Sequence, residues 1–265
     1  MTTKALTKGD KLPAFLKDNK YADIEDAGLE QADSDSFAIP FLRVLQSGSP
    51  QVKKTSGKCI DGAEEGMLFN TVSQEFIDTA KEHVHVVPVY YRRAFMEWKL
   101  REDGGGYVAE HPPEKGAAML AETERDEKNR DILPNGNQIT DTRYHYVMLV
   151  HEDGTFEPLI ITMERSQLKK SKRFNSDINL KRQSRNVPTS ALMYKVGVEG
   201  ETKDDDSWWS WDLKFDDLVQ DQKLFDAAIE FQGQIRAGEI KEAADTLADA
   251  DEDAAEAYGG KGIEF

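Results

Sequence analysis

The chain has 265 residues, with 50 acidic side chains against 34 basic ones and a formal net charge of −16 at pH 7. This length suffices for one sizeable domain, no run approaches the ~20 apolar residues of a membrane span, and the single cysteine, Cys59, excludes an internal disulfide framework. We therefore expect a cytoplasmic protein with one main domain, polar segments at its ends and no membrane contact.

The N-terminal part of the chain predicts an arm followed by the first strands. Residues 1–35 are polar and mixed in charge, which is typical of a flexible arm. Apolar density rises from residue 36, and residues 36–46 predict an extended segment that Pro40 keeps away from the centre of a sheet. A short strand is expected at 67–72, after a loop rich in Gly, Ser and Lys.

The longest predicted strand covers 84–100 and is rich in β-branched and aromatic residues. Strand alternation places Tyr91 and Arg93 on one side of it. The same alternation places Arg92 and Trp98 near the other side. Cations and aromatic rings are therefore interleaved on this part of the predicted sheet.

The rest of the main domain mixes polar excursions, strands and helices. A charged, turn-rich stretch at 107–141 predicts a long excursion with one short helix near 117–128. An Asp-Gly turn between two β-rich runs predicts a hairpin. Strands are expected at 143–150, 155–163, 191–198 and 208–215, and helices near 164–180 and 216–236. The main domain, 36–237, is thus predicted to be mainly β with peripheral helices.

One segment of this acidic chain is strongly basic. Residues 165–195 hold nine cations and one anion, Asp177, so they carry +8 and the rest of the chain carries −24. A concentrated basic strip predicts an anionic partner, and a solvated helix face is the alternative.

Negative charge collects at the C-terminus, where 238–265 predicts a mobile acidic tail because nothing in it can bury an apolar face. A tail tethered to a basic groove would compete with nucleic acid for that groove, and its free end would bind a partner. The tail residues expected to bind a partner are Asp251, Asp253, Glu264 and Phe265. A solubilising appendage is the alternative.

The sequence contains no pattern typical of an enzyme. Walker, dinucleotide-binding and nucleophile-elbow motifs are absent, and the acidic clusters lie in hydrophilic turns or the tail. His83 and His85 share one side of a strand, but the other histidines and Cys59 show no paired-ligand spacing. We expect no catalytic residue, no metal and no cofactor.

The residues favour binding of single-stranded nucleic acid, which needs cations along the phosphates and aromatic faces for the bases. Both occur in several predicted β segments and in the basic stretch. The residues expected to contact DNA are Tyr91, Arg92, Arg93, Trp98, Lys99, Arg143, Lys169, Lys170, Lys172, Arg173, Lys181, Arg182 and Arg185. Further aromatic candidates, for which core packing is the alternative, are Tyr144, Tyr146 and Tyr194.

The order of these elements resembles the OB-fold single-stranded-DNA-binding proteins of tailed bacteriophages. The likeness covers about 36–265 and rests on FAIPFLRVLQSGSPQ leading into MLFNTV, on PVYYRRAFMEWK, on PLIITMERSQLKKSKRFNSDI and on the acidic C-terminus closing with Phe. It implies an OB-fold-like β-barrel that coats single strands, without sequence preference, in phage DNA replication and recombination in the host cytoplasm. It also implies a homodimer, and tail contacts with replication proteins such as a polymerase or a helicase/primase.

Other classes of function remain open at this point. A protein-interaction or virion-assembly factor would use the basic strip to meet an acidic protein. A DNA-mimic inhibitor would present its acidic face to a DNA-processing enzyme. Neither class would bind DNA, whereas a nuclease would degrade it in a metal-dependent way.

Overall fold

The computed structural model describes residues 39–203 and 206–240 of the chain. The strands of this part are β1 (Phe41–Val44), β2 (Leu68–Asn70), β3 (Phe76–Ile77), β4 (His85–Trp98), β5 (Tyr107–His111), β6 (Glu124–Arg125), β7 (Asp131–Ile132), β8 (Gln138–Val150), β9 (Phe156–Met163), β10 (Leu192–Lys203) and β11 (Asp206–Leu218). The α-helices are α1 (Pro113–Ala121), α2 (Leu168–Arg185) and α3 (Gln222–Ala237), and short 3-10 turns are η3 (Arg101–Asp103), η4 (Arg165–Gln167) and η5 (Thr189–Ala191). The arm predicted at 1–35 lies outside the described residues, as does nearly all of the predicted tail.

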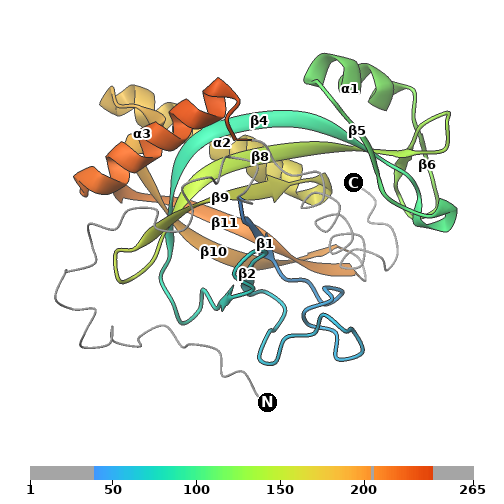
Figure 1. Ribbon diagram of the computed structural model, residues 1–265, viewed down its shortest axis with the longest axis horizontal. Coiled ribbons are helices and arrows are strands. Elements are labelled where there is room, and N and C mark those ends of the chain that lie inside the picture. Colours follow the sequence, from blue (N-terminus) through green and yellow to red (C-terminus); the bar gives the residue numbers. More distant parts are fainter. Residues whose placement is uncertain (1–38, 204–205, 241–265) are drawn as a thin grey trace, which may run out of the picture. The chain divides into compact units, whose positions relative to one another are not determined.

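The described strands join one mixed sheet that curls into a half-barrel (Figure 1). Its main path runs β11-β10-β4-β8-β9-β1-β2-β3, and along it β1 and β9 are parallel while the other neighbours are antiparallel. β4 and β8 are its longest pair, with register from His85↔Val150 to Trp98↔Gln138. This mainly β architecture with peripheral helices confirms the predicted fold class and is compatible with an OB-like fold.

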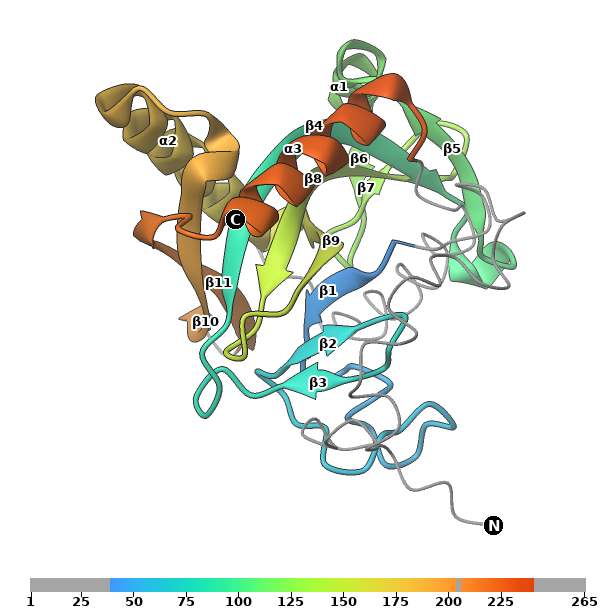
Figure 2. The same cartoon turned by 60° about the vertical axis from the view of Figure 1, so that its left-hand side comes forward.

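Side chains alternate between the two faces of the sheet, and each face builds its own core. On β8, Val147 points to one face and packs in a cluster that includes Phe174 of α2. Tyr146 points to the other face and meets Phe231 of α3, with 6.3 Å between the ring centroids. Figure 2 shows α2 and α3 as separate helices against this sheet, and we name the two faces after them. Because both faces are covered, β4 and β8 are buried on both sides over much of their length.

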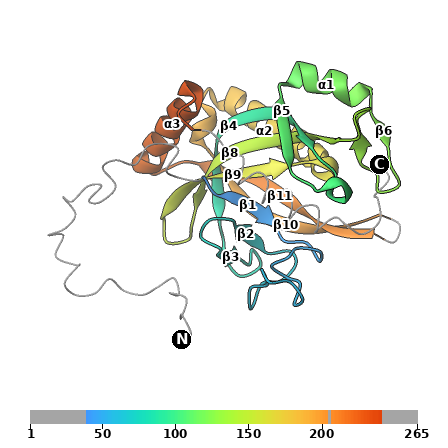
Figure 3. The same ribbon diagram turned by 45° about the vertical axis from the view of Figure 1, so that its right-hand side comes forward.

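The stretch predicted as a polar excursion, 107–141, contains β5, α1, β6, β7 and the start of β8. These elements lie at the end of the long β4–β8 pair (Figure 3). The carboxylate of Glu97, buried on β4, accepts hydrogen bonds from His111 Nε2 at 2.7 Å, Asn135 Nδ2 at 2.9 Å and Asn137 Nδ2 at 2.6 Å. A single buried carboxylate thus ties β5 and the turn before β8 to β4.

Helix boundaries differ from the sequence predictions at three places. α1 begins at Pro113, earlier than the predicted 117, because proline suits the first turn of a helix. β11 continues to Leu218, and α3 begins only after Asp221, whose side chain accepts the Lys223 N–H at 2.8 Å as an N-cap. α2 continues to Arg185, beyond the predicted 180. Of the helices in the described ranges, none is both long and apolar enough to cross a membrane.

Candidate nucleic-acid interface

Helix α2 carries most of the basic stretch and lies with one side on the sheet. Ser171, Phe174 and Ile178 are buried, and their spacing of three and four residues puts them on one side of the helix. The opposite side is left in solvent, and in the first half of the helix it holds Lys169, Lys172 and Arg173. The exposed cations of α2 are Lys169, Lys172, Arg173, Arg182 and Arg185.

Lys170 is only partly exposed and reaches the β10–β11 hairpin. Its ammonium group forms ion pairs with Glu199 and Glu201, the second at 2.6 Å. Burial alone would lower the pKa of Lys170, but the hydrogen bonds to both carboxylates outweigh this effect and raise its pKa above the ordinary value. Lys170 therefore joins the helix to the hairpin, and its charge is already neutralised.

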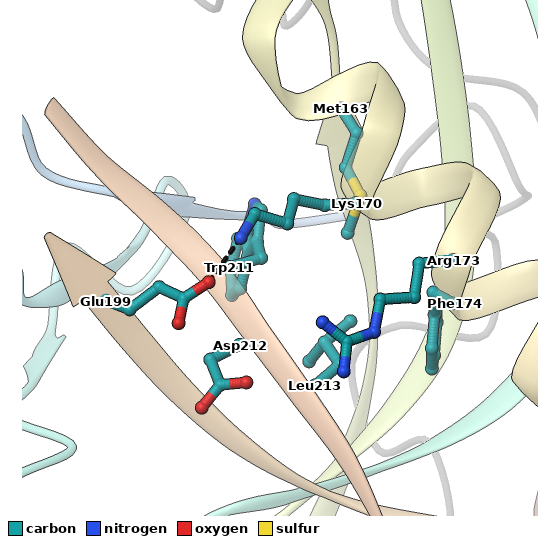
Figure 4. A pocket seen from close by; sticks show the side chains of 8 residues that line it. All are labelled: Met163, Lys170, Arg173, Phe174, Glu199, Trp211, Asp212 and Leu213. Atoms are coloured by element: carbon teal, nitrogen blue, oxygen red, sulfur yellow. Dashed lines mark hydrogen bonds and ion pairs between the residues drawn. The ribbon is translucent and has the colours of Figure 1, made fainter. Parts of the chain in front are cut away.

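A small pocket lies beside this contact, between α2 and the β10–β11 hairpin (Figure 4). Phe174 and Trp211 form part of its apolar wall. Arg173 reaches over it from the helix, and Asp212 and Glu199 approach from the hairpin (Figure 4). Because cations and carboxylates line it together, the pocket has no surplus positive charge for an anion.

The last turns of α2 hold two cations against an aromatic ring. Lys181 Nζ lies 5.0 Å and Arg185 Cζ 4.7 Å from the ring centroid of Phe215 on β11. Such cation–π contacts hold the charges in place while leaving them near solvent. Positive charge at this end of the helix also complements the helix dipole.

On the α2 face, four side chains of β4 and β8 form a connected group, which we call the Tyr91 cluster: Tyr91, Arg93, Asp141 and Arg143. Asp141 accepts hydrogen bonds from Arg93 (Nε 3.0 Å, Nη2 2.7 Å) and from Arg143 (Nε 2.7 Å, Nη2 2.8 Å). Arg143 also donates from Nη1 to the Tyr91 hydroxyl at 2.8 Å. Two guanidinium groups share one carboxylate, so the cluster keeps a surplus positive charge.

The charges of the Tyr91 cluster reinforce one another. Burial would raise the pKa of Asp141, but the hydrogen bonds from Arg93 and Arg143 outweigh it and hold the pKa of this carboxyl below its usual range. Burial likewise opposes the charge of Arg143, yet its hydrogen bonds to Asp141 and Tyr91 raise its pKa. The ionic contacts therefore persist throughout the neutral pH range.

His145 connects the Tyr91 cluster to helix α2. Its ring lies 5.2 Å from that of Tyr91 and 5.3 Å from that of Phe174, and its Nε2 is 2.9 Å from Ser171 Oγ. Burial, with a smaller contribution from Arg143, lowers the pKa of His145 to about 3, so the imidazole is neutral at physiological pH. Helix α2, through its buried side, and the Tyr91 cluster thus lie on the same face of the sheet.

Most of the strand aromatics considered for base stacking are buried. Trp98, one of the expected DNA contacts, is 6% exposed and packs edge-on against Tyr107, with 5.6 Å between the ring centroids. Tyr144, Tyr146 and Tyr194 are core residues with at most 2% exposure. Tyr91 differs from them, since 37% of its surface is exposed.

Two further predicted cations lie apart from this surface. Arg92 points to the α3 face, where its guanidinium lies 4.5 Å from the Tyr144 ring centroid and pairs with Glu110. Lys99 is exposed just beyond the end of β4. The predicted DNA contacts that the structure gathers on the α2 face are therefore those of α2 itself together with Tyr91, Arg93 and Arg143. The predicted tail contacts, Asp251, Asp253, Glu264 and Phe265, lie outside the described residues.

Sequence reasoning missed the residues that position the site. Asp141 and His145 lie two residues before and two residues after Arg143 in a predicted strand. This spacing predicts that the three side chains lie on the same face of the sheet. Glu199 and Glu201 gave no such signal, because their contact with Lys170 depends on how the hairpin folds back along α2. In the described part of the chain, no group of three or more His, Cys, Asp or Glu side chains is placed to hold a metal ion.

A family model described as Pam3 phage gp34-like protein matches residues 4–241. The chain belongs to this family. The gp34-like family is a phage family, which confirms the phage part of the resemblance seen in the sequence. No curated protein matches the chain, and no solved structure does.

Proposed function

We propose that this gp34-like protein binds single-stranded DNA without sequence preference during phage DNA replication or recombination. The observation that carries the proposal is the shared face of α2 and the Tyr91 cluster. In a chain of net charge −16, this face combines exposed cations with an exposed aromatic ring. Single-strand binding uses these two features together, because cations follow the phosphates and rings stack on the bases.

The proposed mechanism begins with electrostatic contact between α2 and the phosphates. Lys169, Lys172 and Arg173 lie on the solvent side of the first half of the helix, and Arg182 and Arg185 continue the charge along the second half. Lys170 contributes little, because Glu199 and Glu201 neutralise it. Binding of this kind releases counterions and weakens with salt.

The acidic C-terminal segment is proposed to regulate this surface. Tethered to the domain, it acts at an effective concentration on the order of mM and competes with DNA for the exposed cations of α2. Once displaced, its end, including Phe265, recruits a replication protein such as a polymerase or a helicase/primase. Deleting residues 240–265 should therefore tighten DNA binding at low salt while weakening the partner interaction, and unchanged DNA affinity would remove the tail from the mechanism.

A mobility-shift assay with labelled oligonucleotides of increasing length tests the proposed function. The full chain should bind single strands more tightly as they lengthen, and should prefer them to duplex of the same length. The double variant Lys172→Ala/Arg173→Ala should bind the same single strands more weakly than the wild-type protein does. Absence of length-dependent binding in the wild-type protein would overturn the proposal.

A protein-interaction or virion-assembly factor is the second candidate. Leu180, 64% exposed among the cations of α2, favours it, because an exposed apolar residue suits a protein partner better than a phosphate backbone. In that case the basic face would meet an acidic protein, and the same mobility-shift assay would show no shift. A DNA-mimic inhibitor would also give no shift, and would co-purify with a DNA-processing enzyme.

A further inference from the structure

The ring of Tyr91 is exposed but does not rotate freely. Its hydroxyl accepts a hydrogen bond from Arg143 at 2.8 Å, and one side of its ring lies beside His145 at 5.2 Å. The side chain is thus held at its tip and along its length while 37% of its surface stays in solvent. An aromatic ring fixed in this way loses little further freedom when a planar group stacks on it.

Asp141 sets the positions of the two arginines around this ring. It binds each guanidinium through two hydrogen bonds, and its own side chain is only 10% exposed. The Arg143 side chain is 12% exposed and points to Tyr91, whereas the Arg93 side chain is 32% exposed. Arg93 uses two of its five N–H donors on Asp141, and its guanidinium also rests 4.6 Å from the Phe95 ring centroid.

We infer that the Tyr91 cluster is a subsite for one nucleotide of a single strand, with the base stacked on Tyr91 and the adjoining phosphate bound by Arg93. This inference rests on the proposed function and assigns separate tasks within it. Arg143 holds the ring, Arg93 presents the charge, and Asp141 is the positioning residue for both. The register supports one compact site, because Tyr91 lies directly opposite His145 and Arg93 directly opposite Arg143.

The role of Asp141 separates this subsite from a merely basic surface. A carboxylate beside a bound polyanion normally weakens binding, so its removal should strengthen binding if only net charge mattered. In the subsite, loss of Asp141 releases both arginines and the ring. The variant Asp141→Asn should therefore bind DNA more weakly although it removes a negative charge.

Affinity for oligothymidylate, measured by fluorescence anisotropy at low salt with the full chain, tests the subsite. Tyr91→Ala should weaken binding by about five- to 150-fold, the range for loss of one stacked base. Tyr91→Phe keeps the ring and should lose less. Asp141→Asn should weaken binding by roughly tenfold. The matched control Glu199→Gln removes a negative charge beside Lys170 and should bind at least as tightly as the wild type.

A photocross-link gives a readout that a general loss of stability would not produce. With oligothymidylate carrying 5-bromodeoxyuridine, Tyr91 should be a cross-linked residue in the wild type, and Asp141→Asn should lose this link while links to α2 remain.

Two results would overturn the subsite while leaving the proposed function in place. The first is that Asp141→Asn binds DNA as tightly as the wild type, and the second is that the affinity of Tyr91→Ala lies within twofold of the wild-type affinity. If Asp141→Asn does not fold, the two variants of the exposed Tyr91 decide the matter. Absence of binding by the wild type would overturn both.

Discussion

The side-chain amide of Gln46 forms two hydrogen bonds with the backbone of Trp209, as the backbone of a neighbouring strand would do. Gln46 Nε2 donates to the Trp209 carbonyl at 2.9 Å, and Gln46 Oε1 accepts the Trp209 N–H at 2.8 Å. Gln46 follows β1, whereas Trp209 lies on β11, which is at one end of the sheet order and separated from β1 by four strands. A single buried glutamine thus joins two distant parts of the half-barrel.

Loss of this glutamine should destabilise the domain. Gln46→Ala removes the partner of the Trp209 N–H, whereas the Trp209 carbonyl keeps the hydrogen bond that Gln167 Nε2 donates at 3.2 Å. One unsatisfied buried group costs about 1–3 kcal/mol, so we expect a loss of that size in the free energy of unfolding, measured by urea titration. Gln183→Ala, an exposed glutamine on α2, should change it by less than about 0.5 kcal/mol. Equal stability of the two variants would contradict this assignment.

Two glycines inside helices should respond in opposite ways to alanine. A Cβ on Gly116 of α1 would lie 2.3–2.4 Å from atoms of the Phe95 side chain, whereas a Cβ on Gly233 of α3 would meet nothing within 4 Å. Alanine favours a helix by about 0.5–1 kcal/mol over glycine, but overpacking costs about 1–3 kcal/mol. Thermal unfolding should therefore show Gly116→Ala destabilised and Gly233→Ala slightly stabilised. A gain at Gly116 would mean that α1 does not pack on Phe95 as described.

The buried carboxylate of Glu97 should make stability depend on pH. Burial would raise the pKa of Glu97, but hydrogen bonds from Asn137, His111 and Asn135 outweigh it and lower its pKa below the ordinary 4.5. A lowered folded-state pKa contributes stability that is present above the ordinary pKa and is lost as pH falls through the folded-state value.

Urea unfolding at a series of pH values measures this contribution. The wild-type free energy of unfolding should fall as the pH drops from about 5, and Glu97→Gln should remove part of that slope. Glu122→Gln, an exposed carboxyl after α1, should keep the wild-type slope. The same slope in all three proteins would show that folding does not lower the pKa of Glu97.

Two neighbouring lysines of α2 should differ in their effect on DNA binding. Lys172 is exposed, whereas Lys170 is held by Glu199 and Glu201. Lys172→Ala should weaken single-strand binding and reduce the salt dependence by about one phosphate contact, while Lys170→Ala should change DNA affinity little. Salt-titrated anisotropy of both variants checks this difference, and equal losses would show that the carboxylates do not neutralise Lys170.

The sequence predicted the elements whose pattern is long and local. β4 and the β8–β9 hairpin were expected from their β-rich runs, and the alternation that puts Tyr91 and Arg93 on one side of β4 is confirmed by their shared contacts. The exposure of each ring was not predictable, because it depends on which helix covers which face. α3 packs over part of one face and α2 over part of the other, so Tyr146 and Tyr194 are buried although Tyr91 is not.

Charge segregation was visible in the sequence, but the neutralisation of individual cations was not. The basic stretch does form an exposed helix face, yet Lys170 is paired by carboxylates that lie about 30 residues further along the chain. Asp141 was overlooked because an isolated carboxylate in a strand gives no sign that two arginines share it. Such contacts arise from the register of β4 with β8 and from the docking of α2, which only the folded chain specifies.

The salt dependence of single-strand binding by a variant that lacks the exposed cations of early α2 tests the central claim most directly. For the wild type, about five neutralised phosphates give a slope of log K against log salt near −3.5. Replacing Lys169, Lys172 and Arg173 by alanine should reduce its magnitude by about two, with unchanged thermal stability. A slope equal to that of the wild type would contradict the account, because it would show that DNA does not contact this helix.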